Sequence, residues 1–187
     1  MKQTSLIDCM LKVAFGLMTF CFVTSFTNTK VNHIVKEKIN WLTIEEATAK
    51  LKVEPKPVII DLYTNWCYWC KVMDKKTYRN SNVVSYIKEH FYAVKLNAES
   101  KDTIKWGNKS FIYDARNKVN QFALYLTRGQ LAFPNTILFG DLNDEPASIP
   151  GLMEPKEIEV VLKYFGEKVY EKKNFDEYAK NFKTTWR

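Results

Sequence analysis

An α/β fold is predicted from three features of the sequence. The first is a short apolar run, Val58–Tyr63, whose length and β-branched residues are typical of a strand buried on both faces. The second is a helical stretch that begins near Tyr68 and is followed by another apolar run, Phe91–Leu96. Strand, helix and strand in this order indicate a parallel crossover. The third is the pair Cys67 and Cys70, directly after the first run, at the carboxyl end of a strand where open α/β sheets place their chemistry.

A short strand and a helix are predicted before this unit. Ile39–Trp41 has the character of a strand, and the next residues begin a helix. Thr43 and Glu46 have the spacing of a capping box, in which each side chain satisfies a free backbone donor of the other residue. The helix should end near Lys52, because two prolines follow it.

The middle of the chain continues the alternation of helices and strands. The helix that starts at Tyr68 should break at Asn80–Asn82, and a second helix should run to about His90. Residues 99–118 are polar without clear periodicity, so they are predicted to be an insertion or a long loop. A helix is then predicted over Val119–Leu126.

The C-terminal part should complete the sheet and add helices. Asn135–Phe139 is predicted as the third apolar strand, Ala147–Ile149 as a short strand and Glu154–Phe165 as a helix. Apolar residues beyond this helix are spaced for one face of a further helix, which would either pack on the domain or dock to a partner or a membrane. These residues are Phe175, Tyr178, Ala179, Phe182 and Trp186.

The N-terminus is predicted to direct export. Lys2 and Lys12 precede Val13–Val23, an apolar run about half as long as the roughly 20 residues that a spanning helix needs. Residues 1–25 are therefore predicted to be a signal peptide, with an uncleaved membrane anchor as the alternative. Residues 26–38 are polar and form the predicted linker, and residues 39–187 form one domain with its C-terminal extension.

The sequence allows three interpretations of the cysteine pair: a redox couple, half of a metal site, or a structural staple. A staple between residues this close removes little entropy from the unfolded chain. A zinc site needs about four ligands, and outside the leader only His33 and His90 could join the pair. The net charge of +7 is spread among acids without a basic arm, so nucleic acid is not an expected partner. A redox couple is favoured.

The position of the pair at the start of a helix suits redox chemistry. Unsatisfied backbone N–H groups and the positive end of the helix dipole stabilise a thiolate at Cys67, and Lys71 adds positive charge nearby. Cys67 is then the nucleophile that opens a partner's disulfide. Cys70, one turn later, resolves the mixed disulfide and forms the internal one.

The stretch VIIDLYTNWCYWCK followed by FPNTILF resembles thioredoxin-like proteins. It is similar in particular to the C-terminal periplasmic domain of the bacterial transmembrane thiol:disulfide interchange protein and its secreted stand-alone relatives. The similarity runs from about Ile39 to Phe165. It implies a thioredoxin fold, with a central mixed sheet flanked by helices. To this fold the sequence itself adds a predicted insertion, residues 99–118, before the cis-proline strand and a predicted extra C-terminal helix.

The resemblance also implies roles for individual residues. Asp61 matches the family's buried acid, which would exchange a proton with Cys70, and burial would raise its pKa. Pro134 matches the family's cis-proline. No metal or organic cofactor is implied, because the Cys67–Cys70 dithiol carries the electrons. The residues implied to contact substrate are Trp66, Tyr68, Trp69, Phe133 and Pro134.

Two departures from the family pattern limit these implications. Tyr68 and Trp69 stand between the cysteines where the family pattern has Gly-Pro, so a reduction potential does not carry over. Asn135 separates Pro134 from Thr136, which leaves the details of the substrate groove open.

The predicted function is that of a periplasmic or otherwise exported thiol:disulfide oxidoreductase that reduces disulfide-containing proteins. Its electrons would come from a membrane donor of the interchange type. The alternatives are a disulfide oxidase or isomerase, and a peptide-binding module whose cysteine pair is idle. Residues 99–118 either select partners or are a passive insertion.

Overall fold

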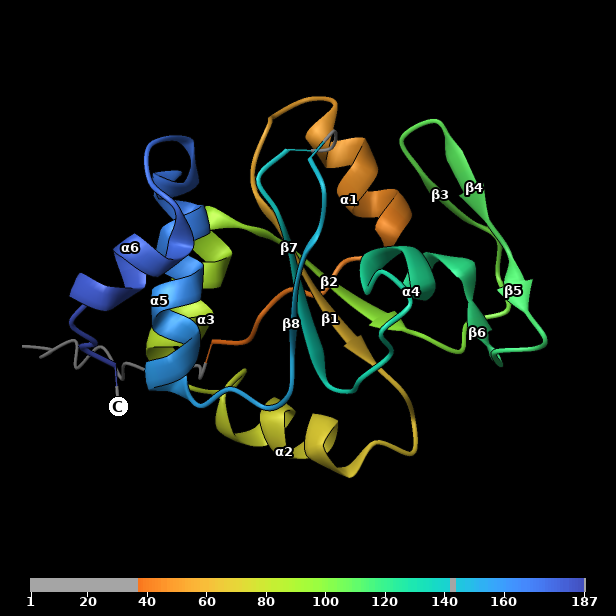
Figure 1. Ribbon diagram of the computed structural model, residues 1–187, viewed down its shortest axis with the longest axis horizontal. Helices are drawn as coiled ribbons and strands as arrows, with labels where there is room; N and C mark the ends of the chain where they lie inside the picture. Colours follow the sequence, from red (N-terminus) through yellow and green to blue (C-terminus); the bar gives the residue numbers. More distant parts are fainter. Residues whose placement is uncertain (1–36, 142–143, 187) are drawn as a thin grey trace, which may run out of the picture. The chain divides into compact units, whose positions relative to one another are not determined.

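The computed structural model describes residues 37–141 and 144–186 (Figure 1). The predicted signal peptide and residues 26–36 of the predicted linker lie outside the described residues. The elements in chain order are α1 (Ile44–Leu51), β1 (Val58–Tyr63), α2 (Tyr68–Lys76), α3 (Ser81–His90), β2 (Tyr92–Asn97), β3 (Ile104–Trp106), β4 (Lys109–Phe111), β5 (Tyr113–Asp114), β6 (Val119–Asn120), α4 (Gln121–Leu126), β7 (Asn135–Phe139), β8 (Ala147–Pro150), α5 (Pro155–Gly166), a 3-10 turn (Val169–Glu171) and α6 (Phe175–Asn181).

A four-stranded mixed sheet forms the centre of the domain, with the strand order β2-β1-β7-β8. β1 and β2 are parallel, which confirms the predicted crossover through α2 and α3. β7 runs antiparallel to β1, and β8 runs antiparallel to β7. The short strands β3 to β6 form two separate two-stranded sheets at one side of the molecule (Figure 1).

Helices cover both faces of the sheet, and the alternation along β1 assigns each side chain to one face. Ile60 and Leu62 are fully buried in the core under α1 and α4. Ile59 faces the opposite core, under α3 and α5. Each such side chain contributes roughly 1.5–3 kcal/mol by leaving water. Asp61 has the same parity as Ile59, so it lies on the face of the sheet from which α2 contributes Met73 to the core.

Several predicted helix boundaries are confirmed. α1 begins with the predicted capping box: Thr43 Oγ1 accepts a hydrogen bond from Glu46 N, and Glu46 accepts one from Thr43 N. α3 begins after Asn80, whose side chain accepts from two amides of the first turn. β7, β8 and α5 also lie where the apolar runs predicted them.

The predicted strand Ile39–Trp41 is wrong. Only an isolated parallel bridge forms there, between Leu42 and Val94. Two backbone bonds hold this bridge, Leu42 N to Ala93 O at 2.8 Å and Lys95 N to Leu42 O at 3.4 Å. The chain then turns into α1, which leaves no length for a continuous edge strand.

Residues 99–118 are more ordered than predicted. β3 and β4 form an antiparallel hairpin in which Trp106 pairs with Lys109, so Gly107 and Asn108 make a two-residue turn. Gly107 has φ +56°, a value that favours glycine. Ile104 and Trp106 are buried in the core. The segment is therefore a folded part of the domain.

The helix predicted over Val119–Leu126 forms, but it begins two residues later than predicted, at Gln121. Val119 pairs with Asp114 in the small sheet of β5 and β6. The side chain of Asn120 accepts a hydrogen bond from Phe122 N at 2.9 Å, so Asn120 is the N-cap of α4.

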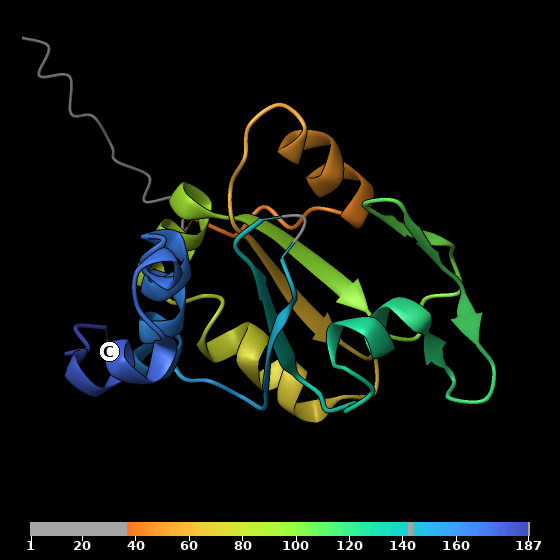
Figure 2. The same cartoon turned by 45° about the horizontal axis from the view of Figure 1, so that its top comes forward.

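The C-terminal helix is shorter than the apolar spacing predicted. α6 ends at Asn181, and Phe182 has an extended backbone. The tail is held by the fully buried Glu159 of α5, whose carboxylate accepts bonds from Thr184, Thr185 and Trp186. Trp186 is half-buried, with its ring centre 5.5 Å from that of Tyr86. The tail packs back on the domain beside α3 and α5 (Figure 2).

Candidate redox site

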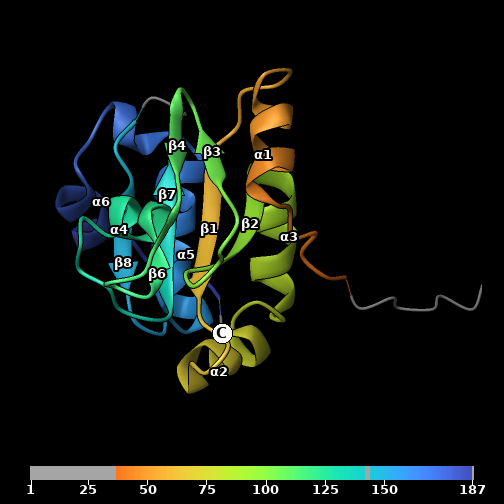
Figure 3. The same ribbon diagram turned by 90° about the vertical axis from the view of Figure 1, so that its right-hand side faces the viewer.

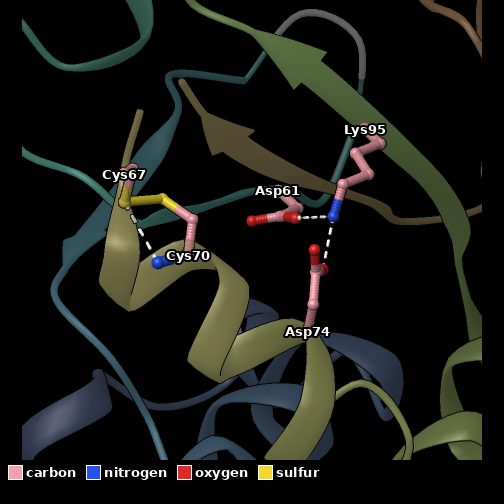
Figure 4. The surroundings of a disulfide bond; sticks show 5 residues. All are labelled: Asp61, Cys67, Cys70, Asp74 and Lys95. Carbon is pink, nitrogen blue, oxygen red and sulfur yellow. Dashed lines mark hydrogen bonds and ion pairs between the residues drawn. A yellow bond between two sulfur atoms is a disulfide. The ribbon is translucent and has the colours of Figure 1, made fainter. Parts of the chain in front are cut away.

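The two cysteines form a disulfide at the start of α2 (Figure 4). Cys67 is the N-cap residue, and its Sγ accepts a hydrogen bond from Cys70 N at 3.0 Å. Cys67 N in turn donates to Thr64 O at 3.2 Å in the turn that leaves β1. The local backbone thus directs a helix amide at the first sulfur, as predicted from the sequence.

Both cysteines are buried in the disulfide form, with 4% of Cys67 and 5% of Cys70 exposed. The aromatic residues around them are open to solvent. Trp66, Tyr68 and Trp69 expose 67%, 68% and 58% of their surface. Three exposed aromatic rings therefore flank the buried sulfur pair along the chain, where they are available to contact a reacting partner.

A shallow apolar cavity lies at the edge of the site. The Phe133–Pro134 peptide bond is cis, and the ring of Phe133 lies edge-on to Trp66 with the ring centres 6.0 Å apart. Trp66 is held from the other side by a 2.9 Å hydrogen bond from its Nε1 to Glu99. The cavity has a volume of about 290 Å³ and is lined by Trp69, Phe133, Pro134, Gly151 and Leu152.

Of the five predicted substrate contacts, Trp69, Phe133 and Pro134 meet in this cavity. Trp66 adjoins it through Phe133. Tyr68 lies against Trp69, with the ring centres 5.3 Å apart. Asn135, which departs from the family pattern, is fully buried, and its Oδ1 accepts a bond from Ser148 of β8. Its side chain therefore belongs to the sheet.

Asp61 is the buried acid of the site, with 2% of its surface exposed. Burial raises its pKa from 3.8 to about 6, against the opposing attraction of the Lys95 ammonium. Lys95 Nζ donates to Asp61 Oδ2 at 2.8 Å. Figure 4 shows Asp61 between the disulfide and Lys95. The carboxyl group can therefore change its protonation state near neutral pH.

A second carboxylate shares the same cation. Lys95 Nζ also donates to Asp74, which lies on α2 one turn after Cys70. Burial acts to lower the pKa of Lys95, but Asp61 and Asp74 together hold it above its usual value. Two carboxylates and one ammonium carry a net negative charge, so the group is suited to take up a proton. The buried Tyr78 lies nearby, and burial, with the Asp61 charge second, raises its pKa well above 10.

Sequence reasoning missed Lys95 and Asp74. A cation inside the apolar run of β2 was the available signal for Lys95. Its partner follows from the register, because Asp61 lies directly beside Lys95 on the parallel strands. Asp74 follows Cys70 by four residues, which places both on one side of a helix.

Residues 37–141 and 144–186 contain no group of three or more His, Cys, Asp or Glu side chains able to bind a metal ion. None of the helices there has the length and hydrophobicity needed to cross a membrane.

The mixed sheet, the Cys-x-x-Cys disulfide at the start of the helix after β1 and the cis-proline before β7 together define a thioredoxin-fold protein with a dithiol centre. Such a centre supports chemistry of the thiol:disulfide oxidoreductase kind. The chain belongs to the DsbH-like thioredoxin family, described as a protein of unknown function, DUF255. The family model matches residues 24–118, which include the cysteine pair.

The chain is also similar to individual known proteins, and the solved structures among them share its fold. An uncharacterized protein of Caenorhabditis elegans is 27% identical over 94 residues, which are 44% of this chain but only 13% of that protein. A DsbH oxidoreductase structure has a TM-score of 0.50 at 17% identity, covering 70% of this chain and 86% of its own. A thioredoxin-fold protein from Helicobacter pylori has a TM-score of 0.51 at 23% identity, and the match covers 67% of this chain and 78% of that protein. The predicted thioredoxin-like resemblance and fold class are confirmed.

Proposed function

We propose that the protein is an exported thiol:disulfide oxidoreductase that reduces disulfides in other proteins. The observation that carries this proposal is the disulfide between Cys67 and Cys70 at the start of α2, whose neighbour Trp69 lines an apolar cavity with Phe133 and Pro134. This arrangement places a cysteine pair that can exchange two electrons next to a surface on which a peptide can lie.

The reaction starts from the dithiol form. The Cys67 thiolate attacks one sulfur of the substrate disulfide; the substrate S–S bond breaks, and its second sulfur leaves as a thiolate that takes a proton. The Cys70 thiolate then attacks the Cys67 sulfur of the mixed disulfide. This step forms the Cys67–Cys70 bond and releases the first substrate sulfur. The substrate gains two electrons, and the dithiol is oxidised to the disulfide.

Asp61 is the proposed proton acceptor for Cys70. Its pKa of about 6 lies close enough to neutrality for the carboxylate to take the thiol proton and give it up again. Lys95 positions this carboxylate through the 2.8 Å bond and is itself held by Asp74. Asp61 and Lys95 are thus distinct in role: the first exchanges the proton, and the second is a positioning residue.

The proposed peptide site is the apolar cavity between Trp69 and Leu152. An extended segment beside a substrate cysteine would place an apolar side chain there while its sulfur meets Cys67. The exposed rings of Trp66 and Tyr68 would form the rim of this contact.

Export and the electron donor rest on the sequence. The apolar run Val13–Val23 after two lysines favours delivery outside the cytoplasm. There, a membrane dithiol donor of the interchange type would return two electrons to the Cys67–Cys70 disulfide and restore the reactive form.

Reduction of insulin by the full chain, with dithiothreitol as the electron source, tests the activity. We expect turnover by the wild type and none above background for Cys67→Ser. Cys21→Ser, which makes the same chemical change outside the pair, is the matched control and should retain the wild-type rate. Equal rates for wild type and Cys67→Ser would reject the proposal.

Equilibration with glutathione buffers tests the direction of electron flow. A potential near the negative, thioredoxin end of the family's range supports the reductase, whereas a potential near the oxidising end transfers the proposal to an oxidase or isomerase.

A binding module with an idle pair is the second candidate, and the 4% exposure of Cys67 favours it. Alkylation of the reduced protein separates the two. Rapid modification of Cys67 supports catalysis, and a Cys67 that resists alkylation in the folded protein supports the binding module.

A further inference from the structure

We propose that the outer face of α2 is a docking surface for anionic phospholipid membranes, which brings the redox site to the bilayer. The inference deepens the proposed function, because it names the surface on which a membrane donor would be met. It rests on exposed aromatic rings and unpaired cations that lie on α2 and in the turns at its two ends.

The position of α2 leaves this face free. The helix lies at the end of the sheet, outside the layers formed by the other helices, in Figures 1 and 3. Its buried side consists of Cys70 and Met73. The exposed residues that we call the α2 face are Trp66, Tyr68, Trp69, Lys71, Lys75, Lys76 and Arg79.

The charge of the α2 face is not neutralised within the described residues. In residues 37–141 and 144–186, none of its four cations forms an ion pair with an acidic side chain. Asp74, the acid of α2, is turned to Lys95. Lys75 and Lys76 lie in the last turn of α2, and Arg79 lies in the turn that follows the helix, so three exposed cations gather at this end of the α2 face. An anionic surface is the complementary partner.

The residue types favour lipid over an acidic protein. Trp and Tyr rings concentrate at the level of lipid headgroups, where one part of the ring is apolar and the other is wet. Lysine stems lie along apolar surface while their ammonium groups reach phosphates. Protein interfaces are also enriched in Trp, Tyr and Arg, but they are depleted in lysine, so the three lysines are what distinguish a membrane from a protein partner here. The three rings with three lysines and one arginine match the membrane interface.

The size of the effect follows from the charges. Each Lys or Arg near an anionic leaflet strengthens partitioning by roughly fivefold, which corresponds to about 1 kcal/mol. Neutralising Lys75, Lys76 and Arg79 should therefore weaken binding by about a hundredfold. High salt should weaken the wild type as well, because it screens exposed charges.

The test uses the full chain in its disulfide form, with vesicles of phosphatidylcholine alone or mixed with phosphatidylglycerol. The matched variants are Lys75→Gln/Lys76→Gln/Arg79→Gln on the α2 face and Lys105→Gln/Lys172→Gln/Lys180→Gln at exposed positions elsewhere. Both remove the same charge. We expect the first to lose about a hundredfold of its partitioning into the anionic vesicles and the second to retain it.

Brominated lipids show which face meets the membrane. The five tryptophans all lie in residues 41–186, and only Trp66 and Trp69 are strongly exposed. Docking through the α2 face should therefore quench tryptophan fluorescence, whereas binding through the N-terminal segment alone should not.

Three outcomes would overturn the inference: no preference for anionic vesicles, equal losses in the two triple variants, or binding without quenching. An acidic protein partner would give the first of these. Insulin reduction in solution is measured separately and should be unchanged in the α2 variant. Failure of vesicle binding is thus distinguishable from failure of the oxidoreductase activity.

Discussion

Replacing Asp61 by Asn should stabilise the protein at neutral pH, and the gain should disappear in acid. Asp61 is buried, and its pKa is raised from 3.8 to about 6, chiefly by burial. The folded state therefore holds the charged carboxylate at a cost that the unfolded state does not have. Asn keeps a similar shape without a charge.

The magnitude follows from the shift. A rise of about 2 pKa units at 1.36 kcal/mol each corresponds to about 3 kcal/mol. The attraction of Lys95 is already contained in this value, since the pKa of about 6 is the net result. Well below pH 3.8 both states are protonated and the cost vanishes. It grows as the pH rises from about 4 to about 6 and is complete above 6.

Urea unfolding of the oxidised protein from pH 4 to pH 8 measures this difference. The free energy of unfolding of Asp61→Asn minus that of the wild type should rise by about 2.5 kcal/mol across the window, because about 0.5 kcal/mol of the total of about 3 kcal/mol is already present at pH 4. Asp176→Asn removes a carboxylate from the exposed first turn of α6 and serves as the matched control. A difference that does not change between pH 4 and pH 8 would refute a raised pKa at Asp61.

Three further changes probe the surroundings of the site and the core. Lys95→Met removes the cation that opposes the rise in the pKa of Asp61, so this pKa, read from the pH dependence of the unfolding free energy in the same urea series, should rise further. A pKa that stays near 6 in the variant would contradict the role of Lys95. Glu159→Gln should lower the free energy of unfolding at pH 7 by about 2 kcal/mol, because hydrogen bonds to charged groups contribute roughly this much. Burial alone would raise the pKa of Glu159, but hydrogen bonds from Lys163, Thr184, Thr185 and Trp186 lower it to about 2. The stabilisation by the charged carboxylate is therefore complete above pH 4.5 and is lost as the pH falls toward 2. A urea midpoint of Glu159→Gln equal to that of the wild type at pH 7 would show that the charged carboxylate does not stabilise the fold. Trp106→Ala should cost about 3–5 kcal/mol by leaving a cavity in the core, whereas the exposed neighbour Lys105→Ala should stay within about 0.5 kcal/mol. Similar thermal midpoints for these two variants would show that β3 does not contribute to the core.

The elements with long apolar runs or clear caps were predictable from sequence. β1, β7 and α5 are continuous apolar or amphipathic segments, and Thr43 and Asn80 mark helix starts through their side-chain oxygens. These signals are local, so they can be recognised in a short stretch of sequence without knowing which segments pack against it.

The short elements of residues 99–118 were not predictable by periodicity. A three-residue strand such as β3 has a single alternation, Ile104 and Trp106 inward with Lys105 outward, which is too short to distinguish from chance. The turn Gly107-Asn108 was the better signal, because a two-residue glycine turn is typical of a hairpin. Deleting this segment would remove Ile104 and Trp106 from the core, so deletion cannot test whether it selects partners.

In the redox site, too, the features encoded by one local motif were predictable, and those that depend on several elements were not. Cys67 and Cys70 follow from one motif at the end of one strand, so their place was predictable. The state of Asp61 depends on three elements at once: the parity of β1 directs it toward α2, the register with β2 places Lys95 beside it, and the turn of α2 after Cys70 brings Asp74 to the same ammonium. A slip of one residue between β1 and β2 would point Lys95 to the other face and leave Asp61 buried without a cation. The acid–base behaviour of the site is thus a property of strand register, which no single stretch of sequence contains.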